Sequence, residues 1–183
     1  MRVISGAARG RQLLFPPKSK ARPTSDRIKE AFFNILAPVT GKTFLDLFAG
    51  SGSIGIEALS RGAGFVGFIE KETSHCDYIN KNLLRCGFTG NYDIFRTEVK
   101  KAIPLLKKKG VHFDILFADP PYEAGLIEET LGQFTDGKLL TSGSTIIFQH
   151  SVREEPDWER EMSLNLLDQR KYGDTLLTFL TSI

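Results

Sequence analysis

Strand-like and helix-like segments alternate along the chain from residue 43, and this alternation restricts the fold more than any other feature. The pattern predicts strands near residues 43–48, 65–70, 92–97, 113–118, 144–149, 164–171 and 175–181. It predicts helices near residues 53–61, 73–86, 98–109 and 123–134. Apolar strands that are separated by helices are typical of a parallel sheet covered on both faces. We therefore expect an α/β fold.

The last two predicted strands depart from this alternation. Only the stretch "QRKYGDT" lies between them, and it offers a turn around Gly173 and Asp174 rather than a helix. Two strands joined by so short a turn form a hairpin and run in opposite directions. One antiparallel strand is therefore expected in an otherwise parallel sheet.

The beginning of the chain differs from the rest in charge. Residues 1–42 carry a net charge of +7, and the remainder carries −5. Within this part, "MRVISGAARGRQLLFPP" predicts two short strands at 2–5 and 12–15. The stretch "PTSDRIKEAFFNILAP" predicts a helix that Thr24 or Ser25 caps and Pro38 ends. We interpret residues 1–40 as a small basic appendage to a main domain of residues 41–183. A polyanionic partner explains such a segment, and a merely solvated basic segment is the alternative.

Cysteine, histidine and apolar residues exclude several classes of protein. Cys76 and Cys86 are spaced like no metal or redox motif, and the three histidines are scattered, so we assign no metal site. The chain has no run of about 18 apolar residues that would span a membrane, and its basic start lacks the apolar core of a secretory signal. We expect a cytoplasmic protein with free thiols, and a monomer because no long exposed apolar stripe stands out.

A glycine-rich turn separates the first strand of the alternating part from its helix, in "FLDLFAGSGSIGIEAL". Gly50, Gly52 and Gly55 have the spacing G-x-G-x-x-G, which is used where a backbone approaches a nucleotide closely. Glu70 ends the next strand, about where an acid meets ribose hydroxyls in such sites. Asp46 lies on the first strand just before the turn. Together these residues predict a nucleotide-like cofactor at the turn.

Asp46 helps to choose between cofactors. A carboxylate beside a helix N-terminus repels the pyrophosphate of a dinucleotide, but it attracts a ligand with an ammonium group and no phosphate. S-adenosylmethionine is such a ligand. Glu98, after the third strand, is a candidate for a contact with its adenine amino group. The open alternatives are an Asp46 that only accepts bonds from loop amides, a solvated Glu70, and a Glu98 that only favours a helix dipole.

The sequence "FDILFADPPYEAG" ends a buried strand with an acid, two prolines and an aromatic ring. Asp119 is expected at the same edge of the sheet as Asp46 and Glu70, because ligands of parallel sheets lie beyond the carboxyl ends of the strands. Prolines lack N–H donors, so the carbonyls near Pro120 can serve as acceptors in the cleft. A carboxylate and a carbonyl suit an exocyclic amino group, and Tyr122 offers a flat face for a planar ring.

This arrangement fits N-methylation of a nucleobase. An amine conjugated to a purine is a poor nucleophile, and acceptors that hold both N–H bonds aim its lone pair at the methyl group. A strong base is not required before attack, since the proton becomes acidic once the new N–C bond has formed. A stacked base has to turn out of its helix, and Tyr122 can replace the lost stacking at about 1–3 kcal/mol. The alternative is a motif that simply ends a strand.

These motifs resemble the class I S-adenosylmethionine-dependent methyltransferases, in which the box (D/N)-P-P-(Y/F/W) marks the branch acting on amino groups. More closely, the chain is similar to the RsmD-type bacterial 16S ribosomal RNA guanine-N2 methyltransferases, nearly end to end. The matching stretches are "RVISGAARGRQL", "RPTSDRIKEAFFNIL", "FLDLFAGSGSIGIEALSRGA", "FIEKE" and "DPPY". The resemblance implies a Rossmann-like sheet of seven strands in the order 3-2-1-4-5-7-6, with strand 7 antiparallel.

The resemblance also implies roles for individual residues. The cofactor site by position consists of Asp46, Phe48, Gly50, Gly52 and Glu70. The amine site consists of Asp119, Pro120 and Tyr122. The residues expected where the N-terminal helix meets the cleft and the RNA are Arg22, Thr24 and Arg27. Glu98 departs from the family pattern, which has Asp or Asn there. "FQHS" replaces a segment that often carries an acid, so Gln149 and His150 receive no role.

The favoured hypothesis is an enzyme that converts one guanine of 16S rRNA to N2-methylguanine. It uses S-adenosylmethionine, releases S-adenosylhomocysteine and needs no metal. The expected partner is 16S rRNA within an assembling small ribosomal subunit, because phosphate contacts position a large RNA. The basic residues expected to make these contacts are Arg2, Arg9, Arg11, Arg22 and Arg27. The alternatives are an N-methyltransferase of DNA adenine or cytosine or of a protein glutamine, a nucleotide- or RNA-binding module without chemistry, and an NAD-linked oxidoreductase.

Overall fold

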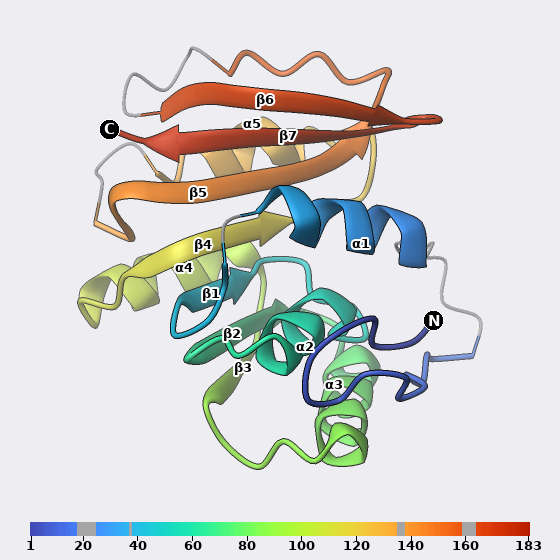
Figure 1. The fold of residues 1–183 in the computed structure, drawn as a ribbon. Coiled ribbons are helices and arrows are strands. Elements are labelled where there is room, and N and C mark those ends of the chain that lie inside the picture. The colour runs from blue at the N-terminus through green and yellow to red at the C-terminus, as the bar shows by residue number, and fades with distance from the viewer. Residues whose placement is uncertain (18–24, 37, 135–137, 159–163) are drawn as a thin grey trace.

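A mixed sheet of seven strands forms the middle layer of a computed structural model that describes residues 1–17, 25–36, 38–134, 138–158 and 164–183 (Figure 1). The strands are β1 (Thr43–Asp46), β2 (Phe65–Glu70), β3 (Tyr92–Arg96), β4 (Phe113–Ala118), β5 (Leu140–Ser151), β6 (Leu164–Tyr172) and β7 (Thr175–Ser182). Their order is β3-β2-β1-β4-β5-β7-β6. β7 pairs antiparallel with β5 and β6, and the other neighbouring pairs are parallel. The predicted strand order and the antiparallel seventh strand are confirmed.

Helices cover both faces of this sheet (Figure 1). They are α1 (Asp26–Ile35), α2 (Ser53–Ser60), α3 (Thr73–Cys86), α4 (Val99–Lys108) and α5 (Leu126–Leu131). The first three helices contribute to one hydrophobic cluster, and the last two contribute to a second. Successive side chains of a strand point to opposite faces, so Ile115 and Phe117 of β4 join the first cluster while Leu116 joins the second. None of the helices in the described ranges is long and apolar enough to cross a membrane.

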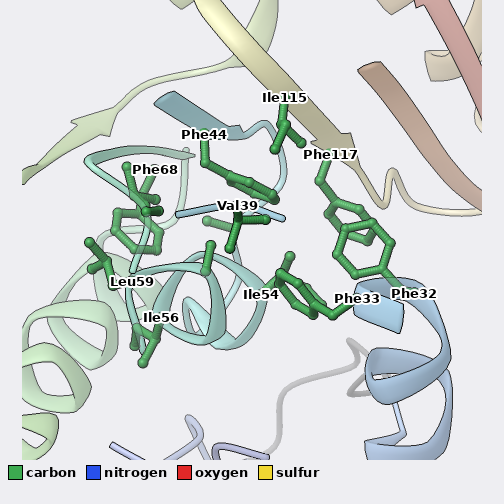
Figure 2. Close-up of a cluster of buried hydrophobic side chains, with 14 of the residues drawn as sticks. Phe32, Phe33, Val39, Phe44, Ile54, Ile56, Leu59, Phe68, Ile115 and Phe117 are labelled. Carbon is green, nitrogen blue, oxygen red and sulfur yellow. The ribbon is translucent and has the colours of Figure 1, made fainter. Parts of the chain in front are cut away.

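α1 brings the N-terminal part of the chain into the first cluster (Figure 2). Ser25 caps this helix, since its Oγ accepts a hydrogen bond from the N–H of Ile28 at 3.2 Å. The ring centroid of Phe32 lies 4.5 Å from that of Phe33 and 5.1 Å from that of Phe117 on β4. Earlier residues that belong to the same cluster are Val3, Ala8 and Leu13. The N-terminal part therefore shares its core with the sheet.

The first seventeen residues form less β-structure than predicted. Instead of two paired strands at 2–5 and 12–15, they contain one isolated antiparallel bridge between Arg2 and Gln12. Backbone groups of this segment bond to α2 instead. The N–H groups of Ile4 and Ser5 donate to the carboxylate of Glu57 at 2.7 and 3.0 Å. A minimal hairpin docked on a helix thus replaces the predicted pair of strands.

Gly6 lets this segment lie directly against the end of α2. A Cβ atom on Gly6 would lie 1.7 Å from the carbonyl oxygen of Ser60. The N–H of Ala7 donates to that carbonyl at 2.8 Å, and the N–H of Ala8 donates to the Ser60 Oγ at 2.9 Å. Any side chain at position 6 would push the segment away from the helix.

Two elements differ from the prediction by more than two residues. α5 begins at Leu126 rather than near residue 123, because Glu123 has a left-handed backbone with φ of 58° that a right-handed helix does not contain. β5 begins at Leu140 rather than near residue 144. Its pairing with β4 shifts register between Phe113 and Ile115, and Leu140 pairs with Phe113 before this irregularity.

Candidate active site

Three acidic residues gather at the carboxyl ends of neighbouring strands. Asp46 ends β1 and Glu70 ends β2, while Asp119 follows β4 directly. β1 lies between β2 and β4, and Asp46 pairs in register with Phe68 and Phe117 on these strands. The helix after β1 leads to β2 on one side, whereas β4 lies on the other side, so this is the point where ligands bind in open α/β sheets. The predicted meeting of the three acids is present.

Asp46 is buried, with 1% of its surface exposed. The pKa of its carboxyl is raised from 3.8 to about 8, mainly by burial and in smaller part by the negative charges of Asp119 and Glu70, while the hydrogen bond from the Gly55 N–H acts to lower it. That N–H donates to Oδ2 at 3.2 Å. Asp46 therefore accepts a hydrogen bond from the backbone at the start of α2. This agrees with the alternative in which Asp46 accepts bonds from backbone amides near the turn. The N–H of Phe48 is a second backbone donor to this carboxylate.

Glu70 organises the glycine turn. Its Oε2 accepts a hydrogen bond from the N–H of Gly50 at 2.8 Å, and its Oε1 accepts one from the N–H of Glu72 at 2.8 Å. The Nδ1 atom of His75 lies 3.5 Å from Oε2. With 9% of its surface exposed, Glu70 is a held acceptor rather than a solvated strand end. Carboxylate oxygens accept more than one hydrogen bond, so this one can also receive a ligand hydroxyl.

The three glycines of the turn meet different requirements. Gly52 is the N-cap of α2 with a left-handed φ of 81°. A Cβ on Gly55 would lie 2.2 Å from the ring of Phe68, so this glycine lets α2 pack against β2. Among the described residues, no atom lies within 4 Å of a Cβ built on Gly50. The turn thus combines tight packing behind it with open space in front, next to the carboxylate of Glu70.

The loop after β4 carries the predicted amine site. Asp119 is half-buried and Pro120 is buried, whereas Tyr122 is 43% exposed. The Tyr122 hydroxyl lies 3.4 Å from the Oγ1 of Thr175 at the start of β7. Burial raises the pKa of Tyr122, and the charge of Asp119 adds to this rise, which shows that the acid and the phenol are near each other. An acid and a partly exposed ring therefore stand together at the mouth of β4.

Glu154 holds this loop and was not anticipated. Its Oε1 accepts a hydrogen bond from the N–H of Glu123 at 2.9 Å, and its Oε2 accepts one from the N–H of Ser151 at 3.0 Å. The left-handed residue Glu123 is thereby tied to the end of β5. In the sequence Glu154 stands beside Glu155 in "SVREEPDW", and no motif separates the two. Only the spatial contact identifies it.

Glu98 and Phe48 lie at the margins of the site. Glu98 is the N-cap position of α4, and its carboxylate lies 3.3 Å from the Nζ of Lys101 and 4.0 Å from that of Lys100. The hydrogen bond and the charge of Lys101 hold the pKa of Glu98 below its usual value. Its role toward an adenine stays a prediction. Phe48, after β1, packs against the second hydrophobic cluster and is half-buried.

Gln149 and His150, which received no role, are buried at the end of β5. The Nδ1 of His150 lies 3.1 Å from the Ser151 carbonyl oxygen, and its Nε2 lies 2.8 Å from the Oγ1 of Thr178. A carbonyl oxygen only accepts, so Nδ1 carries the proton and Nε2 accepts from Thr178. Burial lowers the pKa of His150, which keeps the ring neutral. His150 thus links β5 to β7, and Gln149 hydrogen bonds to Tyr122.

The basic residues predicted to contact RNA are exposed wherever the structure describes them. These residues are Arg2, Arg9, Arg11 and Arg27. Arg2 lies 3.7 Å from Asp26 in an exposed ion pair. Arg22 and Thr24 lie outside the described residues. Within the described ranges, no group of three or more His, Cys, Asp or Glu residues is placed to hold a metal ion.

Comparison with known proteins identifies the family of the chain. A family model described as Conserved hypothetical protein 95 matches residues 1–181. The chain belongs to this family, the RsmD family. The resemblance inferred from the motifs is confirmed, and the acids at β1, β2 and β4 are features of an RsmD-family protein.

Two curated relatives show how far the similarity extends. The ribosomal RNA small subunit methyltransferase D of Escherichia coli strain K12 is 39% identical over 153 residues, covering 83% of this chain and 75% of that protein. The protein of the same name from Haemophilus influenzae is 35% identical over 163 residues, covering 85% of this chain and 81% of that protein. Both relatives are thus similar over most of their own length.

Solved structures agree with this family and with its fold. The Escherichia coli protein yhhF and a hypothetical protein from Thermus thermophilus each match with a TM-score of 0.84 at 30% identity. The matches cover 100% of this chain, with 97% of the first protein and 99% of the second. The Rossmann-like architecture of the RsmD family therefore extends over the whole chain.

Proposed function

We propose that this RsmD-family protein transfers a methyl group from S-adenosylmethionine to the exocyclic N2 amine of one guanine in 16S rRNA. The observation that carries the proposal is the meeting of Asp46 and Glu70 with Asp119 at one edge of the sheet. It occurs in a chain that is 39% identical to a ribosomal RNA small subunit methyltransferase D. The proposed cofactor site and amine site thereby share one edge of the sheet.

The residues at β1 and β2 fit the cofactor. Open space beside Gly50 and the held carboxylate of Glu70 suit ribose hydroxyls. The buried carboxyl of Asp46 suits a cationic ligand, because a positive charge nearby favours its ionised form. Phe48, Gly52 and Glu98 complete the proposed contacts, with Glu98 toward the adenine amino group. When bound, S-adenosylmethionine supplies an electrophilic methyl group on a sulfonium.

The loop after β4 would hold the amine. Asp119 and the Pro120 carbonyl accept the two N–H bonds and aim the nitrogen lone pair at the methyl group. The exposed face of Tyr122 stacks on the base, which contributes about 1–3 kcal/mol. The C–S bond breaks as the N–C bond forms, and the nitrogen then loses one proton, which the carboxylate of Asp119 would receive. Asp119 acts mainly as an acceptor that orients the amine.

Residues 1–40 would contact the RNA, and residues 41–183 would bind the cofactor. Phosphate contacts from Arg2, Arg9, Arg11 and Arg27 hold a large substrate without reading much sequence. Arg22 and Thr24 belong to the same proposed surface by sequence. We take the substrate to be 16S rRNA in an assembling small subunit, which places the reaction in the cytoplasm, and the enzyme to act as a monomer.

Mass mapping of 16S rRNA tests this function. A strain without the gene should lack one methyl group on one guanine, and the wild-type gene should restore it. A gene with Asp119→Ala should fail to restore it while the protein still binds S-adenosylhomocysteine. Methyl transfer to DNA or protein, but not to ribosomal particles, would contradict the proposal. Restoration by Asp119→Ala would point to a binding module instead.

A further inference from the structure

Asn82 of α3 joins two distant parts of the chain. Its side chain is fully buried, with 0% of the residue exposed. Its Oδ1 accepts a hydrogen bond from the N–H of Leu14 at 2.7 Å, and its Nδ2 donates to the Leu14 carbonyl at 2.9 Å. The same Nδ2 donates to the carbonyl of Ser51 at 3.0 Å. Both amide hydrogens are used, one toward each segment.

On the cofactor side, Asn82 orients one peptide of the glycine turn. The carbonyl of Ser51 and the N–H of Gly52 belong to the same planar peptide. Asn82 holds that carbonyl, and the Gly52 N–H donates to the Ala49 carbonyl at 2.7 Å. Glu70 holds the neighbouring N–H of Gly50. Two side chains from different elements thus orient the peptides of the turn.

On the N-terminal side, Asn82 takes the place of a neighbouring strand. It pairs with both backbone groups of Leu14, as a strand in a ladder would. Leu14 follows a turn that is closed by backbone bonds from Val3 N–H to Arg11 and from Gly10 N–H to Val3, at 3.0 and 2.9 Å. This turn carries exposed Arg9 and Arg11. In Figure 1 the segment, in dark blue, runs beside α2 and α3.

We propose that Asn82 is a positioning residue that couples RNA engagement by the N-terminal segment to cofactor binding at the glycine turn. The coupling runs from the Arg9–Arg11 turn through Leu14 and Asn82 to Ser51. Fixing either segment orders the side chain that holds the other, so each ligand strengthens the binding of the other by the same factor. The identity of the two ligands rests on the proposed function.

The variant Asn82→Ala tests this role, with Asn80→Ala as its matched control. Asn80 is exposed on the same helix and donates only within it, to the Cys76 carbonyl at 3.2 Å. Asn82→Ala should raise the Kd for S-adenosylhomocysteine and the KM for the RNA substrate, each on the order of tenfold, with kcat within about twofold. Asn80→Ala should match the wild type. A folded Asn82→Ala protein with lower thermal stability but unchanged Kd and KM would overturn the proposal.

Hydrogen exchange of the wild-type protein tests the coupling without a variant. Adding S-adenosylhomocysteine should slow exchange in residues 11–17 as well as in residues 47–55, although Leu14 is no predicted cofactor contact. Slower exchange in 47–55 alone would overturn the coupling and leave the proposed function intact. No slowing in either segment, together with no heat of binding, would contradict the proposed function itself.

Discussion

At the scale of single residues, burial determines the protonation of the acids in the site. Asp46 and Glu70 both sit at strand ends and both accept backbone N–H hydrogen bonds, but Asp46 is more deeply buried, with 1% of its surface exposed against 9% for Glu70. The pKa of Asp46 consequently rises to about 8, mainly through burial. A carboxyl with this pKa is protonated at neutral pH, and it ionises when a cationic ligand binds beside it. This gives the cofactor site a pH dependence of known sign.

Cofactor affinity should increase with pH through the pKa of Asp46. Below about pH 8 the ligand-free carboxyl is protonated, and a cationic ligand prefers the ionised form, so binding releases a proton. The affinity for S-adenosylmethionine should rise by up to about tenfold per unit between pH 6 and 8. Calorimetric titration measures this rise, and Asp46→Asn should flatten it. A flat profile in the wild type would show that Asp46 is ionised throughout.

The same shift affects the ligand-free fold in the opposite direction. The unfolded carboxyl has its usual pKa of 3.8, whereas the folded one holds its proton up to about pH 8. Between these values the folded state binds more protons, so the free energy of unfolding should fall as pH rises. Urea unfolding at pH 5 and pH 8 measures the free energy of unfolding at the two ends of this range. Asp46→Asn should lose this part of the pH dependence.

Tyr122 should matter for turnover more than for cofactor binding. Its ring is 43% exposed at the mouth of the site, and its proposed partner is the base. Tyr122→Ala should lower kcat/KM for RNA by roughly 5- to 150-fold, which corresponds to about 1–3 kcal/mol of lost stacking. Its Kd for S-adenosylhomocysteine should stay within about twofold. Tyr122→Phe keeps the ring and should stay close to wild type, and equal losses in both measurements for Tyr122→Ala would contradict the stacking role.

At the scale of elements, the N-terminal turn is a rigid support for its arginines. The N–H of Val3 donates to the Arg11 carbonyl, and the N–H of Gly10 donates to the Val3 carbonyl. These backbone bonds close the turn that carries Arg9 and Arg11. The segment is also bonded to α2 through Glu57 and Ser60. Its exposed charges can therefore change without changing the turn.

Reversal of both charges, Arg9→Glu with Arg11→Glu, should weaken RNA binding. Each lost phosphate contact lowers the salt slope of log K by about 1, so a decrease of about 2 is expected. Without RNA, the Kd for the cofactor should stay unchanged. The control is Lys108→Glu with Lys109→Glu at the end of α4, where both side chains are exposed and the charge change is the same. A collapse of cofactor affinity would mean that the arginines support the fold.

At the scale of the whole molecule, a buried ion pair joins the N-terminal part to the sheet domain. The Nζ of Lys29 on α1 lies 3.6 Å from Glu57 on α2, and both side chains are fully buried. Lys29 also donates to the Arg2 carbonyl at 2.6 Å, and Arg61 bonds to Glu57 at 2.8 Å. Burial lowers the pKa of Lys29, against the attraction of Glu57. The start of the chain and α1 are thus bonded to the sheet domain through α2.

Removing Lys29 should destabilise the whole chain. Lys29→Met leaves the buried Glu57 carboxylate with fewer partners, which should lower the free energy of unfolding by about 3 kcal/mol. Urea unfolding followed by circular dichroism measures the loss. The control is Lys42→Met, since Lys42 is 49% exposed and 3.8 Å from Asp114. That change should stay within about 0.5 kcal/mol, and equal stability of the two variants would contradict a shared core.

Patterns within short stretches of the sequence predict most of the fold without knowledge of tertiary contacts. The periodicity of apolar residues, the glycine spacing and the short turn at Gly173 act over a few residues each, so the order of elements and the terminal hairpin follow from them. The edge shared by Asp46, Glu70 and Asp119 also follows, because strands of one direction end together. Element boundaries were less certain: the left-handed residue Glu123 and the register shift before Ile115 have no local signal.

Contacts between distant segments determine which buried polar groups meet. Asn82 lies 68 residues from Leu14, and Glu57 lies 53 residues from Ile4, yet each side chain satisfies the backbone of the other segment. Burying an amide or carboxylate costs free energy unless a partner is present, and the partner depends on which segments pack together. Local sequence patterns therefore predict the sheet, the glycine turn and the edge where the three acids lie. The packing of the N-terminal segment onto α2 and α3 decided how that turn is held.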